Sequence, residues 1–341
     1  GSGSLGAKEF ACGAVRNLSI ATDNKRKIVS AGVIAPLKQL LSEKELGTRA
    51  QENICGAFWN LGINGENQLA LFDADIIPNL LDLLASTTAT QTCKEFAGGS
   101  FRAMAVNQAN KQRLFEKEDV MPAMRALLNQ QNHMKGQEQA AACMWNLSVA
   151  STNQVPMFKL GIMDELIFVL KNDLATKMTK EYVTGIVRAL GNNTENRVPM
   201  FRSGVALPLI ELLKGTNVKA QEQACAALWN FGVADDNQIA LFRYGVVPAM
   251  LELLTSTIAT PGSKEFVAGC FRALSVSEEN RLPLYKAGVC PAMFSLTSTG
   301  NANGRENARK VLFNMCLNST CRAHIKRLGV TAASINWTDA F

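Results

Sequence analysis

Histidine is almost absent from this sequence, with two copies, His133 and His324, in 341 residues. Because these two lie far apart in the chain, a Ser/His/Asp or Cys/His catalytic set has no credible general base. Cys316, Cys321 and His324 come nearest to a metal cluster, but a fourth ligand is missing and their spacing matches no zinc pattern. No glycine-rich phosphate loop follows an expected strand. We therefore expect no enzyme activity, no metal and no cofactor.

Long apolar runs are absent as well, since none reaches the roughly 18 residues of a membrane helix. Apolar residues make up 47% of the chain and charged residues 19%, which indicates a soluble protein with an ample core. The net charge of +6 leans mildly toward acidic partners. Most of the nine cysteines lie in helical patterns, which favours reduced, buried thiols and a cytoplasmic protein. The first four residues, 1–4, have the composition of a cloning scar, which would hide any native acylation signal.

An asparagine recurs every 41 to 43 residues along most of the chain. Asparagine is a strong helix N-cap, so we predict that each copy opens a short helix. Eight residues later a glycine usually follows, which predicts a sharp corner with positive φ before a second helix. Asp75 and Glu118 replace this glycine, and we expect their corners to be built differently. The repeated asparagines are Asn24, Asn67, Asn110, Asn153, Asn196, Asn237 and Asn280, and the corner glycines are Gly32, Gly161, Gly204, Gly245 and Gly288.

A longer third helix completes each unit, as in residues 221–232, where apolar residues at 224, 227, 228 and 231 form one buried face. The same register position in successive third helices holds Asn17, Asn60, Ala103, Asn146, Ala189, Asn230, Ala273 and Asn314. We expect one repeat domain over residues 5–341, with a lone third helix first and units starting near residues 24, 67, 110, 153, 196, 237 and 280. Residues 321–341, including Trp337, would form a C-terminal cap over the last apolar edge. An uncovered edge would be a dimer surface.

The phrase G-φ-x-P-x-L-x-x-L-L followed by A-L-x-N-L resembles the armadillo repeat over nearly the whole chain, residues 7–329. Residues 14–18 and 227–231 are more similar to the catenin and vacuolar Vac8-type branch, or to armadillo-repeats-only proteins, than to importin-α. Importin-α has a tryptophan four residues before the register position, where this chain has mainly glycine and alanine. The resemblance implies an all-α fold, a right-handed α-solenoid (the armadillo superhelix) of about seven three-helix repeats plus partial terminal repeats.

The resemblance also implies that the third helices line a concave groove, in which the register asparagines bind the main chain of an extended ligand. An amide side chain suits this role because it offers one donor group and one acceptor, like a peptide unit. The alternative is that these asparagines form hydrogen bonds between helices of the stack.

The third helices alternate between two types, so the true repeat is a double unit of about 86 residues. One type reads Lys-Glu-(Phe/Tyr) with an arginine before the register position, and the other has Trp or Phe there. Arginine, tryptophan and asparagine together are typical of a recognition surface. Alternatively, each tryptophan packs on the next repeat, and each arginine pairs with the glutamate seven residues before it in its own helix. The candidate groove residues are Asn17, Trp59, Asn60, Arg102, Trp145, Asn146, Arg188, Trp229, Asn230, Arg272 and Asn314.

Glycine stands in the middle of five third helices, four residues before the register position, although it costs up to ~1 kcal/mol there relative to alanine. Either a neighbouring helix approaches closely, or the groove floor is open to a ligand backbone. These glycines are Gly13, Gly56, Gly99, Gly185 and Gly269.

The sequence therefore predicts a cytoplasmic, non-enzymatic scaffold that binds extended protein segments with acidic and apolar side chains. One alternative is an N-terminally acylated adaptor tethered to a membrane or organelle. An alternative from another class is a solenoid that binds single-stranded RNA, which the positive charge favours and the row of glutamates in the third helices opposes.

Overall fold

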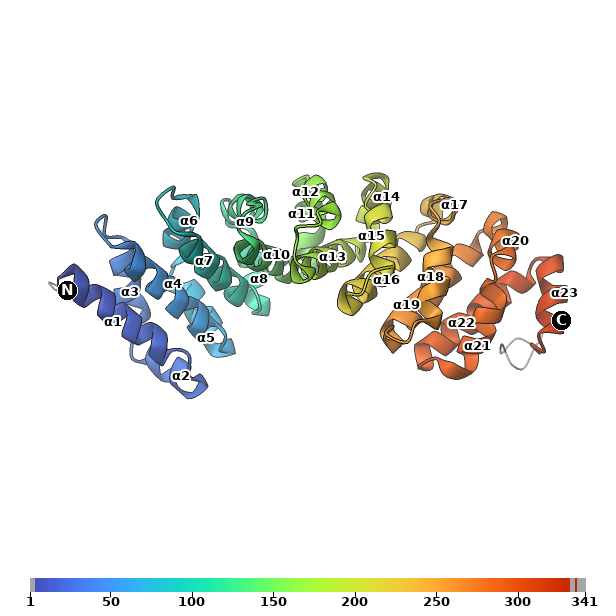
Figure 1. The fold of residues 1–341 in the computed structure, drawn as a ribbon, viewed down its shortest axis with the longest axis horizontal. Helices are drawn as coiled ribbons and strands as arrows, with labels where there is room; N and C mark the ends of the chain where they lie inside the picture. The colour runs from blue at the N-terminus through green and yellow to red at the C-terminus, as the bar shows by residue number, and fades with distance from the viewer. Residues whose placement is uncertain (1–3, 332–334, 336–341) are drawn as a thin grey trace. The chain divides into compact units, whose positions relative to one another are not determined.

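The computed structural model describes residues 4–331 and residue 335 of the chain. Over this part the chain forms 23 α-helices and no strand, which confirms the predicted all-α solenoid (Figure 1). A lone helix, α1, comes first, seven sets of three helices follow, and α23 closes the series, as the repeat period predicted.

The helices of each set have three different lengths and roles. The first helices are α2 Thr22–Ser30, α5 Gly65–Asp73, α8 Gln108–Phe115, α11 Ser151–Lys159, α14 Thr194–Arg202, α17 Asp235–Arg243 and α20 Glu278–Lys286. The second helices are α3 Ile34–Leu41, α6 Ile77–Ala85, α9 Val120–Leu128, α12 Met163–Lys171, α15 Ala206–Leu213, α18 Val246–Thr255 and α21 Val289–Thr299. The third helices are α1 Leu5–Leu18, α4 Thr48–Gly62, α7 Gln91–Met104, α10 Met134–Ser148, α13 Lys177–Gly191, α16 Val218–Gly232, α19 Pro261–Val276 and α22 Ala302–Cys316. The last helix, α23, is Ser319–Arg327.

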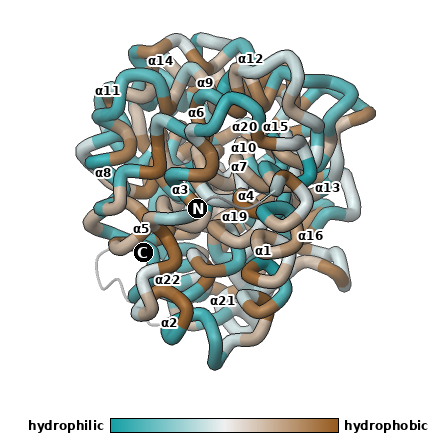
Figure 2. Tube along the Cα trace, turned by 90° about the vertical axis from the view of Figure 1, so that its left-hand side faces the viewer, coloured by the Kyte–Doolittle hydropathy of each residue, from teal (hydrophilic) through white to brown (hydrophobic). Residues whose placement is uncertain are grey.

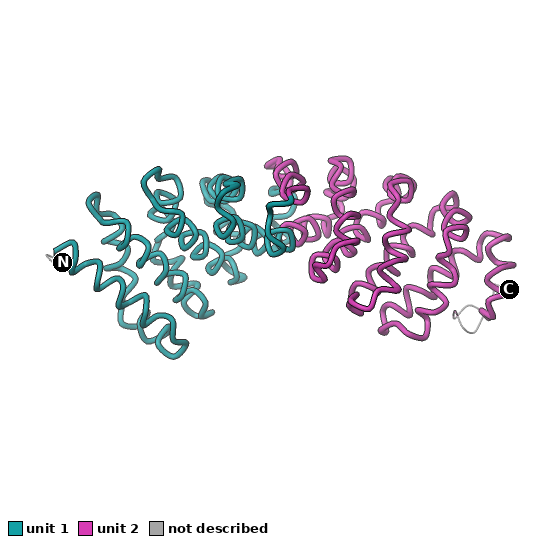
Figure 3. Tube along the Cα trace, viewed as in Figure 1, with its two compact units in different colours: residues 1–157, 173–182 teal, residues 158–172, 183–341 magenta. Residues whose placement is uncertain are grey.

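The contacts divide the chain into two compact units (Figure 3). Unit 1 contains residues 1–157 and 173–182, and unit 2 contains residues 158–172 and 183–341. Each is described by itself below, and the single repeat domain inferred from the sequence stays a prediction.

Each unit buries its core between the third helices and the shorter helices that cover them. In unit 1, α1, α4, α7 and α10 pack one after another, and in unit 2, α16, α19 and α22 do the same. Ile54, Phe58 and Leu61 of α4 are fully buried because their spacing of three to four residues places them on one helix face. Hydrophobic and hydrophilic stretches accordingly alternate along the chain (Figure 2).

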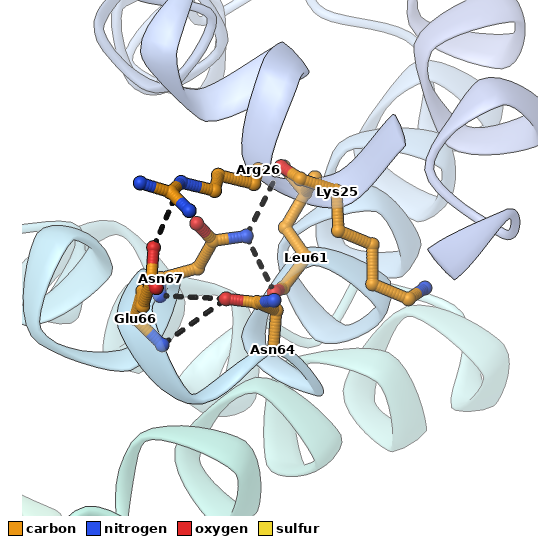
Figure 4. Close-up of polar contacts among 6 residues, drawn as sticks. All are labelled: Lys25, Arg26, Leu61, Asn64, Glu66 and Asn67. Carbon is orange, nitrogen blue, oxygen red and sulfur yellow. Dashed lines mark hydrogen bonds and ion pairs between the residues drawn. The ribbon is translucent and has the colours of Figure 1, made fainter. Parts of the chain in front are cut away.

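The recurring asparagines are not N-caps, and this prediction was wrong. In the second three-helix repeat, the cap is Asn64. Its side chain accepts from the backbone N–H groups of Glu66 and Asn67 at 3.1 and 3.3 Å (Figure 4). Asn67 itself lies inside α5 and is 2% exposed. Its Nδ2 donates to the carbonyl of Leu61, at the end of α4, at 3.0 Å, and to that of Lys25 in α2 at 3.1 Å. One buried amide therefore joins three helices.

The same double hydrogen bond recurs along the solenoid. Asn67 and four further recurring asparagines each donate to a carbonyl near the end of the third helix just before them and to a carbonyl of the preceding first helix. The series continues with Asn110 (Met104 and Gln68), Asn153 (Leu147 and Lys111), Asn237 (Phe231 and Arg197) and Asn280 (Leu274 and Gln238), at 2.9–3.3 Å.

The corner geometry follows the prediction at every described glycine. All five predicted corner glycines have φ between 70° and 88°. Asp75 keeps the same geometry with φ 53°, so it tolerates the left-handed conformation instead of avoiding it. Glu118 does not, because four residues separate α8 from α9 where three separate α5 from α6. That longer turn removes the need for a positive φ.

The first helices alternate between a cationic residue and glutamine at one position, as at Lys25, Gln68 and Lys111, and the ends of the third helices explain why. Lys25 donates from Nζ to the carbonyls of Ser19 and Ile20, and Lys111 donates to those of Ala105 and Val106. These carbonyls close a third helix, where a cation also matches the helix dipole. In the three-helix repeat between them, the side-chain amide of Gln68 donates to the carbonyl of Gly62 at 3.1 Å. Burial lowers the pKa of Lys25 and Lys111.

The C-terminal end is only partly described. Val330 and Ile335 are buried, at 3% and 5% exposed, as a cap would require. Trp337 lies outside the described residues, so its part in the predicted cap stays a prediction. No helix in the described part of the chain is long and apolar enough to cross a membrane.

Removal of one bridging amide should cost more where it has two partners. We expect Asn110→Ala to lower the free energy of unfolding by about 2 kcal/mol, because two buried hydrogen bonds are lost. Asn24→Ala is the matched control, since Asn24 is only half-buried and donates to one carbonyl, that of Leu18. Urea denaturation followed by circular dichroism measures both. Equal losses in the two variants would contradict the bridging role.

Candidate protein-interaction surface

The predicted site residues lie on the third helices and are partly exposed. Every predicted arginine and tryptophan, and every register asparagine except Asn17, is half-buried. Asn17 is exposed, because α1 has no preceding third helix to cover it. We call the surface formed by these side chains the third-helix surface, and it is described within each unit.

Three clusters of arginine, aromatic ring and tryptophan form this surface. In the first, the guanidinium of Arg16 lies 4.7 Å from the ring centroid of Phe96, and Trp59 packs on the same ring at 5.7 Å. In the second, Tyr182 takes the central place, with Arg102 at 5.3 Å and Trp145 at 5.6 Å. In unit 2, Phe266 is held by Arg188 at 5.0 Å and Trp229 at 5.9 Å. Each contact combines cation–π attraction with ring packing.

The central aromatic residues were not predicted as site residues. Their only signal in the sequence was the recurring Lys-Glu-(Phe/Tyr), which assigned them no role. Phe10 holds the same position in α1, the first helix of this type. It is 79% exposed, and within the described residues no tryptophan of another third helix packs on it.

The mid-helix glycines accept these large side chains. A Cβ on Gly99 would lie 2.5 Å from Cδ2 of Trp59, and one on Gly269 would lie 2.7 Å from the same atom of Trp229. Gly56 receives Arg16, whose Nε would be 2.9 Å from an added Cβ. At these positions the glycine therefore admits a side chain of the preceding third helix, and the floor is not open to a ligand backbone.

The arginines do not pair with the glutamates of their own helices, so that alternative was wrong. Each instead donates to an amide oxygen of the next third helix, as Arg102 does to Gln139 Oε1 at 3.1 Å. Glu9 pairs with Arg49, and Glu265 accepts from Asn301 and Asn303. The other arginine–amide pairs are Arg16 with Asn53, Arg188 with Gln223 and Arg272 with Asn307, at 3.0–3.2 Å. Within the described part of the chain, none of these four guanidinium groups has a carboxylate partner.

The glutamates of the tryptophan-bearing third helices form hydrogen bonds with residues at the start of the next third helix. Glu138 accepts a hydrogen bond from the hydroxyl of Thr176 at 2.6 Å, and Glu52 and Glu222 accept from Thr90 and Thr260. Thr90 and Thr260 also cap the helices α7 and α19. These carboxylates are therefore engaged by hydroxyl groups next to helix N-termini, where negative charge is favourable.

The register asparagines form hydrogen bonds between helices, which was the alternative interpretation. Asn146 Nδ2 donates to the carbonyl of Arg102, in the preceding third helix, at 3.2 Å. Asn60, Asn230 and Asn314 donate in the same way to the carbonyls of Arg16, Arg188 and Arg272, at 3.2–3.4 Å. Among the described residues no hydrogen bond reaches Oδ1 of these four side chains. An acceptor group therefore remains for a ligand, whereas the donor group is already used.

The register alanines are close-packed. Ala103 and Ala273 are 5% and 7% exposed, and the Cβ of Ala103 lies 2.8 Å from the point that a Cβ on Gly62 would take. The residue at position 62 must therefore be a glycine to admit Ala103. The interruption of the asparagine row coincides with this close packing.

At the C-terminal end of unit 2 the surface includes a cavity of about 410 Å³. Arg272, Phe313 and Asn314 line it, together with Ile335.

The buried cysteines behave as apolar residues, since burial raises the pKa of the Cys143 thiol to about 12. No group of histidine, cysteine or acidic side chains in the described part of the chain could hold a metal ion.

Comparison with known proteins identifies the repeat. Residues 22–62 and 193–231 match the model of the Armadillo/beta-catenin-like repeat. These two segments are armadillo-like. The crystal structure of an engineered protein from the Northeast Structural Genomics Consortium matches with a TM-score of 0.69 over 98% of this chain and 93% of that one. At 17% sequence identity, this match shows the fold alone. No curated protein matches the sequence.

Armadillo repeats generally suggest a protein-interaction scaffold. The catenin-type or Vac8-type subgroup inferred from residues 14–18 and 227–231 stays a prediction.

The glycine at position 99 should be required for the seating of Trp59. We expect Gly99→Ala to lower the free energy of unfolding by about 1–3 kcal/mol and to shift tryptophan fluorescence, because the new methyl group overlaps the indole. Gly65→Ala is the control, since no atom lies within 4 Å of the added Cβ, and it should be neutral or slightly stabilising. Thermal unfolding and emission spectra measure both. A Gly99→Ala variant as stable as the parent would contradict the contact.

Proposed function

We propose that the chain is a non-enzymatic scaffold of the cytoplasm that binds extended protein segments on its third-helix surface. The observation that carries the proposal is the set of arginines at Arg16, Arg102, Arg188 and Arg272. Each has a neutral amide partner, and the first three also have an aromatic partner. These partners fix the position of each guanidinium without neutralising its charge, so the site is preorganised for an anion. Acidic side chains of a partner supply that anion.

The tryptophans supply the apolar part of the same site. Trp59, Trp145 and Trp229 each pack one side on an aromatic ring and remain partly exposed, which is typical of anchoring residues at interfaces. The free Oδ1 of a register asparagine accepts from a backbone N–H of the partner. A segment with alternating acidic and apolar side chains therefore fits each cluster.

The cytoplasmic placement is supported by nine free and buried cysteines. A lipid anchor, a dimer through a terminal edge and binding of single-stranded RNA draw no particular support from the described contacts. The carboxylates of Glu52, Glu138 and Glu222 lie on the third helices that alternate with those of the arginines. They would repel a phosphate backbone, which carries a charge at every nucleotide, more than a segment whose acidic side chains are spaced apart.

Selection from a displayed library of random short peptides tests the proposal. We expect enriched sequences to combine acidic with apolar residues. The variant Arg102→Gln/Arg188→Gln, with one change in each unit, should weaken an enriched peptide by about tenfold or more in fluorescence polarisation, because each change removes a charged anchor. The combined variant Trp145→Ala/Trp229→Ala/Arg188→Ala should abolish binding while the helical circular dichroism is kept.

Arg202→Gln is the matched control, because Arg202 is an exposed arginine on a first helix and lies outside the clusters. Its affinity should equal that of the parent. Binding that survives the arginine and tryptophan substitutions, or enrichment of basic peptides that still bind the double arginine variant, would contradict the assignment.

A further inference from the structure

A cleft on the second helices of unit 1 is separate from the third-helix surface. It lies between α6 and α9, has a volume of about 430 Å³, and falls within the range of roughly 300–1,000 Å³ that is usual for ligand sites. Leu81 and Leu84 of α6 and Ala123 and Ala126 of α9 provide most of its apolar lining. The two alanines leave the space that larger side chains would fill.

Two carboxylates, those of Asp82 and Asp119, lie at this cleft, and both residues are exposed. Asp119 precedes α9 at the N-cap position, but its side chain accepts no hydrogen bond from the backbone of that helix. Within the described part of the chain neither carboxylate has a hydrogen-bond or ion-pair partner. The described lining contains no lysine or arginine. The cleft is therefore apolar and carries uncompensated negative charge.

The preceding layer of the same unit shows what occupies such a carboxylate. There Asp75, the counterpart of Glu118 in the repeat, lies one position before Ile76, the N-cap residue of α6, whereas Asp119 is itself the N-cap residue of α9. The Nζ of Lys38, in α3, lies 3.6 Å from Asp75 Oδ2 and donates to the carbonyl of Ala74 at 3.1 Å. A lysine of the neighbouring second helix thus compensates the corner aspartate.

In the next layer this lysine is missing. Lys38 follows the buried Leu37 in α3, and the residue that follows the corresponding buried Leu80 in α6 is Leu81. The cation is replaced by a side chain that lines the cleft. The corner of this layer therefore has no lysine from the preceding second helix, and Asp119 lines the cleft together with the apolar Leu81.

We propose that the α6/α9 cleft binds a protein segment that presents a lysine or arginine beside an apolar side chain. The partner's cation takes the place that Lys38 holds in the preceding layer, between Asp119 and Asp82. Its apolar side chain covers Leu81, Leu84 and the two alanines. This occupant differs in charge from the acidic segment expected at the third-helix surface, so the two sites select different partners or different parts of one partner.

Methyl NMR of the full chain tests the proposal, with the methyl groups of Ala123 and Ala126 as reporters. The probe is a short synthetic peptide of alternating lysine and leucine. Two further peptides replace lysine with glutamate, or leucine with serine. We expect saturable shifts at both methyl groups with the lysine–leucine peptide and none with the glutamate–leucine peptide, because the carboxylates repel it. The lysine–serine peptide should bind at least about tenfold more weakly, since it has no apolar side chain to bury.

Three variants complete the experiment. Asp82→Asn/Asp119→Asn should weaken the lysine–leucine peptide about tenfold, because two exposed charge contacts are lost. Leu81→Lys should abolish the shifts, since it restores the internal lysine of the preceding layer. Asp173→Asn, at an exposed aspartate of unit 1 outside the cleft, should bind as the parent does.

Three results would overturn the proposal. The first is that the methyl resonances of Ala123 and Ala126 do not shift with the lysine–leucine peptide. The second is that the Asp82→Asn/Asp119→Asn variant binds this peptide as tightly as the parent. The third is that the shifts depend on protein concentration alone, which would assign the cleft to a second copy of the chain. None of them bears on the third-helix surface, whose residues lie outside the cleft.

Discussion

The buried amide that joins three helices is the constraint on which the rest of the solenoid depends. Asn67 and its counterparts are withdrawn from water, so their donors must find acceptors, and the acceptors are carbonyls of two different helices. These two hydrogen bonds fix the angle between a third helix and the first helix that follows it. They also fix the register between successive first helices. A hydrophobic face alone would permit sliding by a turn. The amide does not, because a shift would leave its donors unpaired.

Fixed register is what allows the third helices to carry large side chains in tight places. Trp59 approaches Gly99 so closely that one methyl group would collide with it, and Ala103 fits against Gly62 with similar closeness. Small and large residues must therefore meet at set positions in alternate layers. The same alternation places a cation at the end of one third helix, as with Lys25, and an amide at the end of the next, as with Gln68. The double repeat is thus a packing pattern before it is a binding pattern.

The helices, their order and most of their ends could be predicted, because hydrophobic period, corner glycines and repeat length are local signals. The roles of particular side chains could not. Asn67 was assigned to a cap because asparagine is favoured there, whereas Asn64, three residues earlier, is the actual cap. One interpretation of the sequence paired Arg102 with a glutamate of its own helix. Its actual partners are Gln139 and Tyr182, from two other third helices. Contacts between layers join residues about 40 or 80 positions apart, and no local pattern specifies which of several polar neighbours will face a given side chain.

Charge is sorted in unit 1 by helix type, and this follows from the layer contacts. On the third helices, amides and rings hold Arg16 and Arg102 in place without opposing their charge. On the second helices, Leu81 of α6 stands where α3 has Lys38, and Asp82 and Asp119 line the cleft there without a lysine or arginine. A modest net charge of +6 conceals these opposite surfaces. A solenoid can maintain both because each layer is fixed by its buried amides, so surface side chains are free to vary without loss of register.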